Sequence, residues 1–261
     1  MTLDIFTISI LGLLGLAIGF VGGLVGLVLG VVRFPLILGS VGTSAAISAG
    51  TNMGISTLGA FAAAIRHFQQ NNVHRRIFII MGITGAAGAF LGSLLTRFVP
   101  VTVLLLSIGV IVSYEAFSLI KSSRKIQKSD IQVSKPSATN SVLSESAIGF
   151  GIGFLGGLVG LVLGSIRVPT MISVLKMEPR VAVGTNLAAS SIMGAAGLFG
   201  HVLNGEVDFS ILAVMGSTAM IGGYIGAKFT SRFNATTLKL IIGIVLAFVA
   251  VIMFLRVALT S

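Results

Sequence analysis

Long apolar runs that carry almost no charge make up most of this chain, and they decide what it can fold into. Charged residues are 9% of the 261 residues and apolar residues are 55%, with a mean hydropathy of +1.07. An average soluble domain is about a quarter charged, so this chain has too few charges to cover a globular surface in water. We expect an all-α polytopic membrane protein, because the runs are continuous and lack the ten-residue alternation of a membrane β-barrel.

The first half of the chain recurs in the second half at a constant offset of 134 residues. The segments FVGGLVGLVLGVVRFPL (20–36) and FLGGLVGLVLGSIRVPT (154–170) are identical at 12 of 17 positions. Shared Leu, Val and Gly could follow from composition, but Arg, Pro, Asn and His at one offset indicate a duplication. The polar residues aligned by this offset are Thr51-Asn52 with Thr185-Asn186, Ser56 with Ser190, and His67 with His201.

Each half contains four apolar stretches, which predicts two homologous repeats, residues 1–120 and 146–261, joined by a polar linker, 121–145. The last two stretches of each half are about 20 residues long, the length of one membrane crossing. The first two are interrupted by Gly and Pro, so we expect broken or re-entrant helices there. The stretches are 5–32, 36–65, 77–96 and 101–120 in the first half, and 146–166, 169–200, 209–230 and 236–258 in the second.

Loop charge predicts how the repeats enter the membrane. The linker has five Lys or Arg and the loop 66–76 has three Arg, which places both on the cytoplasmic side of the cell membrane by the positive-inside rule. The equivalent loop of the second half, 201–208, has two acids and no Lys or Arg. Opposite charge on equivalent loops favours inverted repeats, which need an odd number of crossings each. The alternative is four crossings per repeat in parallel orientation.

Composition also bears on function. Without cysteine, disulfides, thiolate metal sites and thiol chemistry are excluded, and with three His and seven acids we expect no metal and no cofactor. The net charge of +10 comes from cations between apolar runs, so we expect lipid and not nucleic acid as the partner. No nucleophile with a base, paired carboxylates or nucleotide-binding loop is present, so we expect neither an enzyme nor an ATP-driven pump. A homo-oligomer remains open.

Arg33 and Arg167 are the strongest candidates for a binding site. Each follows an apolar run without other charges and lies two residues before a proline. An ionised group inside a membrane is expensive, which makes a functional role the default interpretation. A break near Gly30–Phe34, with a helix starting at Pro35, would aim free N–H groups at an anion, and Arg adds a planar fork that matches oxyanions. The alternative is that both arginines are interface anchors that reach the headgroups.

Further polar residues recur in both halves and extend this hypothesis. Asn and Thr inside membrane helices commonly bond a neighbouring helix, but they also donate to substrate oxygens. Histidine titrates near physiological pH and can couple transport to protons, although a loop histidine at headgroup level is the plainer interpretation. The candidates for the anion site are Gly30, Thr51, Asn52 and Ser56 with Gly164, Thr185, Asn186 and Ser190, and those for proton coupling are His67 and His201.

The ordered motifs of both halves resemble the TauE/SafE family of membrane transporters. They are GGLVG before a Gly and Pro, then AGTN or VGTN, then a helix ending in RH before NNV or in GH before NGEVD. The resemblance covers essentially the whole chain and implies two homologous halves that export sulfite, sulfonates and related organosulfur anions. The chain departs from the family pattern at Leu27–Leu29 and Leu161–Leu163, where glycines are usual, and at the two arginines, where aliphatic residues are common.

These observations predict a secondary transporter that exports small anions by alternating access, with its site near the membrane midplane between the two repeats. The anion would be held by the two arginines, two helix N-termini and the Thr-Asn pairs. An anion channel lined by the same residues is one alternative. A non-transporting membrane scaffold, in which these residues only pack, is the other. The residues themselves indicate an oxyanion, and the organosulfur substrate follows from the resemblance alone.

Overall fold

A computed structural model describes residues 5–41, 44–98, 110, 113–114, 116–117, 119–121 and 142–260. Among these residues every regular element is helical and none is a strand. Most of the predicted linker and of the stretch 101–120 lies outside the described residues. The elements are α1 (Ile5–Val25), α2 (Gly30–Val41), α3 (Ala45–Gln69), α4 (Arg75–Leu94), η1 (Thr96–Phe98), α6 (Val142–Val159), α7 (Gly164–Ser173), α8 (Pro179–Leu203), α9 (Phe209–Thr230) and α10 (Ala235–Thr260).

Five of the described helices, α1, α4, α6, α8 and α9, are long and apolar enough to cross a membrane. A shorter apolar segment, Thr236–Ile252, lies within α10. The helices α2 and α7 have only 12 and 10 residues. At about 1.5 Å per residue each falls well short of the roughly 30 Å hydrocarbon layer. The chain is therefore a multi-pass helical membrane protein with two short helices among its spans.

The chain turns sharply before each short helix, at Gly26 and Gly160. Their φ angles are +75° and +67°, a region that glycine enters without steric cost. The sequence prediction of a break at Gly30–Phe34 was wrong, because α2 and α7 already begin at Gly30 and Gly164. The proline does not start the helix either, since Pro169 lies inside α7. The turn is set by the residue that tolerates positive φ, several positions before the proline.

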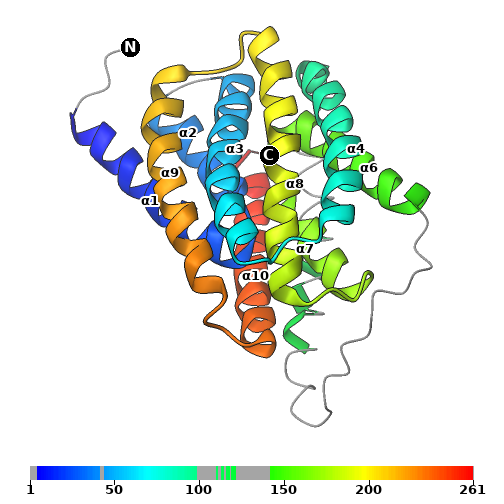
Figure 1. Cartoon of the computed structure of the whole chain (residues 1–261). Helices are drawn as coiled ribbons and strands as arrows, with labels where there is room; N and C mark the ends of the chain where they lie inside the picture. The colour runs from blue at the N-terminus through cyan, green and yellow to red at the C-terminus, as the bar shows by residue number, and fades with distance from the viewer. Residues whose placement is uncertain are drawn as a thin grey trace.

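The helices α3 and α8 lie side by side at the centre, with α9 against α3 and α4 against α8 (Figure 1). On the outside α1 packs along α9, and α6 packs along α4. Glycines allow this close approach. A Cβ on Gly153 of α6 would collide with the Gly85 backbone of α4, and one on Gly226 of α9 would collide with the Phe20 backbone of α1.

The central helices point in opposite directions. The loop after α3 reaches the start of α8, where the His74 N–H donates to Thr185 Oγ1 at 2.9 Å. The loop after α8 reaches the start of α3, where the Asp208 N–H donates to Thr51 Oγ1 at 2.8 Å. Figure 1 shows the two loops at opposite ends of the bundle, the α3–α4 loop below and the α8–α9 loop above.

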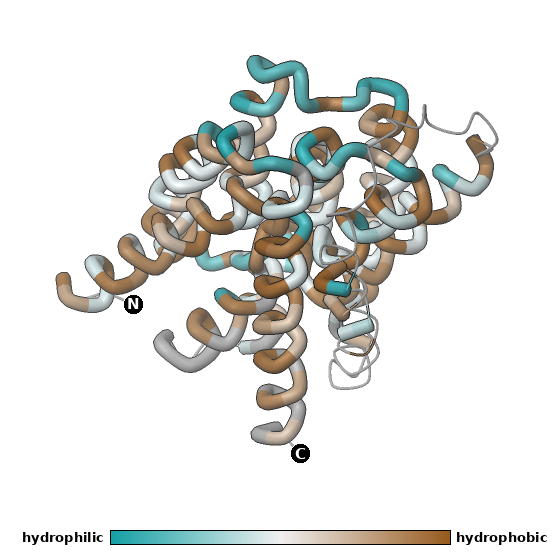
Figure 2. Tube along the Cα trace, turned by 90° about the horizontal axis from the view of Figure 1, so that it is seen from below, coloured by the Kyte–Doolittle hydropathy of each residue, from teal (hydrophilic) through white to brown (hydrophobic). Residues whose placement is uncertain are grey.

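Basic residues gather at the end of the helix bundle where the α3–α4 loop lies. Gln70 of that loop donates to the Lys228 carbonyl at 3.5 Å, which places the end of α9 beside it. Arg180 at the start of α8 donates to the Phe233 carbonyl at 3.0 Å, which brings the α7–α8 and α9–α10 loops together. Seen from this end, hydrophilic residues mark the loops that join the brown apolar helices (Figure 2). The α8–α9 loop at the other end contributes Glu206 and Asp208.

We expect Gly153→Ala to destabilise the protein by about 1–3 kcal/mol, because the methyl group overpacks the α4–α6 contact. Gly151→Ala is the matched control on the same helix, since a Cβ there meets nothing within 4 Å. Thermal unfolding in detergent, followed by size-exclusion chromatography, measures both. Equal loss of stability in the two variants would contradict this account of α4–α6 packing.

The ends of α3 and α8 should be labelled from opposite sides of the membrane. Gln69 and Leu203 are equivalent exposed positions at the 134-residue offset, and the chain has no cysteine to interfere. In intact cells we expect an impermeant maleimide to label Leu203→Cys, and to label Gln69→Cys only after permeabilisation. Labelling of both from one side would contradict inverted insertion.

Candidate functional site

Arg33 lies inside the protein, on the first turn of α2, with 1% of its surface exposed. Its Nε donates to Asn52 Oδ1 at 3.3 Å and its Nη2 to Ser56 Oγ at 2.7 Å. Both partners are on α3, one turn apart. Nη2 also donates to the Val28 carbonyl at 2.9 Å, in the turn that precedes α2. The guanidinium therefore ties the short helix to the central helix.

Arg167 of α7 is held in the same way by the other central helix. It is fully buried, with 0% exposed. Its Nε donates to Asn186 Oδ1 at 2.6 Å and its Nη2 to Ser190 Oγ at 2.7 Å. Its Nη1 contacts the Met193 sulfur. The Asn and Ser partners are those that the 134-residue offset aligns with the partners of Arg33.

Neither guanidinium has a carboxylate partner within 4.0 Å among the residues that the structure describes. Among the described residues, the partners of the two guanidiniums are neutral oxygens or sulfur. Because both side chains are enclosed by protein, neither is an interface anchor that reaches the headgroups, which contradicts that alternative. Two fixed positive charges thus lie in a low-dielectric interior, where an unpaired charge is costly.

The asparagine amides link each arginine to the opposite half of the chain. Asn52 Nδ2 donates to the Gly160 carbonyl at 3.0 Å, and Asn186 Nδ2 donates to the Gly26 carbonyl at 2.5 Å. Each amide also lies against the first residue of a short helix. A Cβ on Gly30 would come within 2.8 Å of Asn52 Nδ2, and one on Gly164 within 2.7 Å of Asn186 Nδ2. Glycine at these two positions leaves the space that the amides occupy.

The two turns and the starts of the two short helices line one small cavity. Both helix N-termini therefore bring their positive ends to the same region. The cavity interior admits about one water molecule, which is too little for a polyatomic anion in this conformation. The lining residues are Leu27, Val28, Leu29 and Gly30 from one half, Leu161, Val162, Leu163 and Ser165 from the other, and Val249 of α10.

Thr51 and Thr185 are fully buried beside the asparagines, but their hydroxyl oxygens serve the loops. Each accepts a backbone N–H, from Asp208 and from His74 respectively. Neither threonine is hydrogen-bonded to the Arg33 or Arg167 guanidinium. In this conformation the asparagine of each Thr-Asn pair binds the arginine of its own half. The threonine binds the loop from the opposite half.

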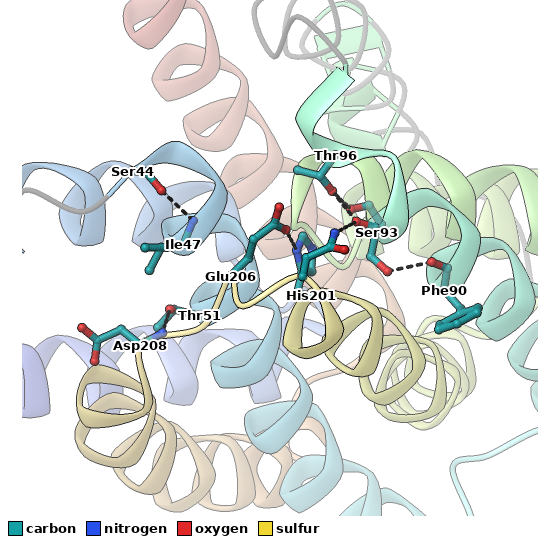
Figure 3. Close-up of polar contacts among 11 residues, drawn as sticks. Ser44, Ile47, Thr51, Phe90, Ser93, Thr96, His201, Glu206 and Asp208 are labelled. Carbon is teal, nitrogen blue, oxygen red and sulfur yellow. Dashed lines mark hydrogen bonds and ion pairs between the residues drawn. The ribbon is translucent and has the colours of Figure 1, made fainter.

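His67 and His201 are completely buried, in contrast to the plainer expectation of histidines at headgroup level. His67 Nε2 lies 3.5 Å from the Gly23 carbonyl of α1. His201 Nδ1 lies 2.8 Å from Glu206 Oε2, and the pair is enclosed with Ser93 and Thr96 at the acidic end of the bundle (Figure 3). The two histidines are equivalent by offset and differ in their partners.

Sequence reasoning did not single out Glu206, Met193 or the Gly26 and Gly160 carbonyls. The signal for Glu206 was present, because the equivalent residue in the first repeat is Asn72. A carboxylate at one of two equivalent positions, with a neutral residue at the other, marks a place where the two halves differ. The carbonyl partners had no comparable signal, since any backbone offers them.

We expect Ser190→Ala to destabilise the protein by about 1–3 kcal/mol, because it leaves a donor of the buried Arg167 unsatisfied. Ser191→Ala is the matched control, since that hydroxyl bonds the Ala188 carbonyl of its own helix. The control should stay within about 0.5 kcal/mol of the wild type. Thermal unfolding of the purified variants measures both, and equal stability of Ser190→Ala and wild type would contradict the assigned bond.

Comparison with known proteins identifies relatives over most of the chain. The family model described as sulfite exporter TauE/SafE matches residues 11–253. The chain is 30% identical to the "Probable membrane transporter protein YdhB" of Bacillus subtilis (strain 168), over 89% of this chain and 92% of that protein. It is 27% identical to a "Probable membrane transporter protein" of Xylella fastidiosa (strain 9a5c), over 97% and 95%. No solved structure matches. The chain belongs to the sulfite exporter TauE/SafE family of membrane transporters.

Proposed function

We propose that this protein is a secondary transporter that exports small oxyanions across the plasma membrane. The observation that carries the proposal is the pair of buried guanidiniums, Arg33 and Arg167, without a carboxylate partner among the described residues. A buried charge is stabilised by an opposite charge, and a membrane protein that keeps two such cations binds an anion near them. The planar fork of each arginine suits the oxygens of a sulfo group.

The short helices α2 and α7 add to the positive electrostatic field of the two arginines. Each begins beside the cavity between the two turns, so its free N–H groups and positive dipole end favour an anion there. Broken helices that meet near the midplane are the usual binding site of inverted-repeat transporters. The substrate site of this proposal lies at the starts of α2 and α7, with Asn52 and Asn186 as its amide donors.

Alternating access is the proposed way in which the anion crosses the membrane. The proposal treats the two halves as inverted repeats, supported by the antiparallel α3 and α8 and by equivalent bonds at the 134-residue offset. The cavity is closed to a polyatomic anion in this conformation, so a relative movement of the halves must open it. The crossed asparagine bonds are the contacts that such a movement breaks and re-forms.

Export follows from electrostatics once the site is anionic. With the basic end of the bundle in the cytoplasm, an anion leaving the cell gains about 2.3 kcal/mol per charge for each 100 mV of inside-negative potential. The family description, sulfite exporter, makes sulfite and related organosulfur anions the first substrates to test.

We expect saturable exchange of one radiolabelled anion among sulfite, sulfate, thiosulfate and a small sulfonate in proteoliposomes. Arg33→Gln and Arg167→Gln should each lower the exchange rate by about 10- to 150-fold, since a hydrogen bond to a charged group contributes about 1.5–3 kcal/mol. Arg232→Gln, an exposed cation at the basic end, is the matched control and should exchange like the wild type.

Three outcomes would contradict the proposal. Ion currents too fast for one conformational cycle per anion would replace the transporter with a channel. Unchanged exchange in folded Arg33→Gln/Arg167→Gln protein would move the site away from the arginines. Absence of any anion movement in folded wild-type protein would favour the scaffold alternative.

A further inference from the structure

One buried titratable pair lies outside the arginine site, at the acidic end of the bundle. His201, near the end of α8, is 0% exposed, and Glu206 in the following loop is 8% exposed. His201 Nδ1 and Glu206 Oε2 are 2.8 Å apart. The carboxylate is the partner that still touches the outside, so it is the entry point for a proton that the pair shares.

No such pair is present in the part of the first half that the structure describes. His67 occupies the position equivalent to His201, but the residue equivalent to Glu206 is Asn72, whose Nδ2 donates to Gln70 Oε1 at 3.2 Å. His67 instead faces the Gly23 carbonyl at 3.5 Å. Among the described residues, no ion pair involves His67. The duplication therefore preserves both buried histidines but gives only one of them a carboxylate.

The pair is built against the helix that holds Arg33. A Cβ on Gly50 of α3 would collide with the Glu206 carbonyl and come within 2.9 Å of the His201 Cβ. The next residue, Thr51, accepts the Asp208 N–H from the same loop at 2.8 Å. Asn52, which follows, binds the guanidinium of Arg33. The loop with Glu206 is thus fastened to the turn of α3 that positions the anion site.

The pair also contacts the C-terminal end of α6. The Gly157 backbone lies at the His201 ring, and Thr96 Oγ1 donates to the Gly157 carbonyl at 3.2 Å. Three residues later, the Gly160 carbonyl accepts from Asn52. A change in charge at His201 therefore acts on both sides of the Arg33–Asn52–Gly160 bridge, through α3 and through α6.

The charged groups around the His201 ring come from the α8–α9 loop. That loop presents Glu206 and, at the start of α9, Asp208, whose carboxylate accepts the Ser210 and Ile211 N–H groups as a helix cap. Among the described residues, the neighbours of the pair from the other elements are uncharged: Gly50 and Thr51 on α3, Ser93 on α4 (Figure 3), Thr96 on η1 and Gly157 on α6. Within the described part of the chain, Glu206 is the carboxylate that pairs with the ring.

We propose that His201 and Glu206 form the proton-binding site that couples proton and anion movement in the same direction, and that His67 takes no part in the coupling. This inference rests on the proposed transport function. With neutral His201 and ionised Glu206 the pair carries one negative charge, which opposes an anion at the neighbouring Arg33 site. One proton makes the pair neutral overall and removes that opposition. Proton and anion then bind together and leave together, so a dianion still carries one net negative charge outward and its export is still favoured by the inside-negative potential.

Proteoliposomes with the membrane potential clamped at zero test this, using a sulfonate or sulfate that stays ionised. If one proton accompanies each anion, a pH difference of one unit sustains an anion concentration ratio of about tenfold, with accumulation on the alkaline side. Glu206→Gln should reduce this ratio to near unity while anion exchange at equal pH continues. Asp208→Asn is the matched control, because Asn also caps a helix; it removes a charge from the same loop and should keep the full ratio.

The outcomes separate this inference from the transport proposal. Exchange in the wild type without accumulation driven by pH, accumulation on the acidic side, or a full ratio in Glu206→Gln would overturn the proton site and leave the transporter standing. Absence of exchange in the wild type would overturn both.

A second measurement needs no folded variant at Glu206. Histidine-selective NMR of the wild type in nanodiscs follows three histidines, and the His201 signal is the one missing from His201→Gln. Linkage requires that the anion raise the proton affinity of the pair by the factor by which the proton raises anion affinity, expected at about 5- to 150-fold. No change in the His201 titration at saturating anion would overturn the proposal, and so would the same change at His67.

Discussion

The hydrogen bonds that the two buried arginines donate to Asn52 and Asn186 are the interaction on which the rest of the structure depends. A guanidinium in a low-dielectric interior persists only where its donors are satisfied, and here neutral amide and hydroxyl oxygens satisfy them without neutralising the charge. Short helices, glycine turns and central helices are all arranged around these two bonds. The two guanidiniums are thus hydrogen-bonded, but their positive charge is not neutralised and attracts an anion.

The same asparagines make the site a property of both halves together. Each amide binds the arginine of its own half with its oxygen and the turn of the other half with its nitrogen. The glycines at the turns and at the starts of α2 and α7 leave room for these contacts. Movement of one half relative to the other therefore changes the surroundings of both charges at once, which is what alternating access at a shared site requires.

Much of the site could be predicted from the sequence, because Arg, Asn, Ser and His recur at one offset of 134 residues. That pattern grouped these residues as one candidate site, and the structure brings Arg33 to Asn52 and Ser56 as well as Arg167 to Asn186 and Ser190. The helix starts were misplaced because a proline signal was given more weight than the positive φ that only glycine accepts easily. The crossed bonds to Gly160 and Gly26 could not be predicted, since backbone carbonyls carry no sequence signal.

The position of a bound oxyanion tests the central claim most directly. Selenate is the selenium analogue of sulfate. Its selenium atom can be located by anomalous scattering in crystals of the wild-type protein. The account predicts a selenium peak at the starts of α2 and α7, with oxyanion oxygens about 2.7–2.9 Å from the nitrogens of Arg33 or Arg167. A peak only among the exposed cations of the basic end, in protein that exchanges the anion, would contradict it.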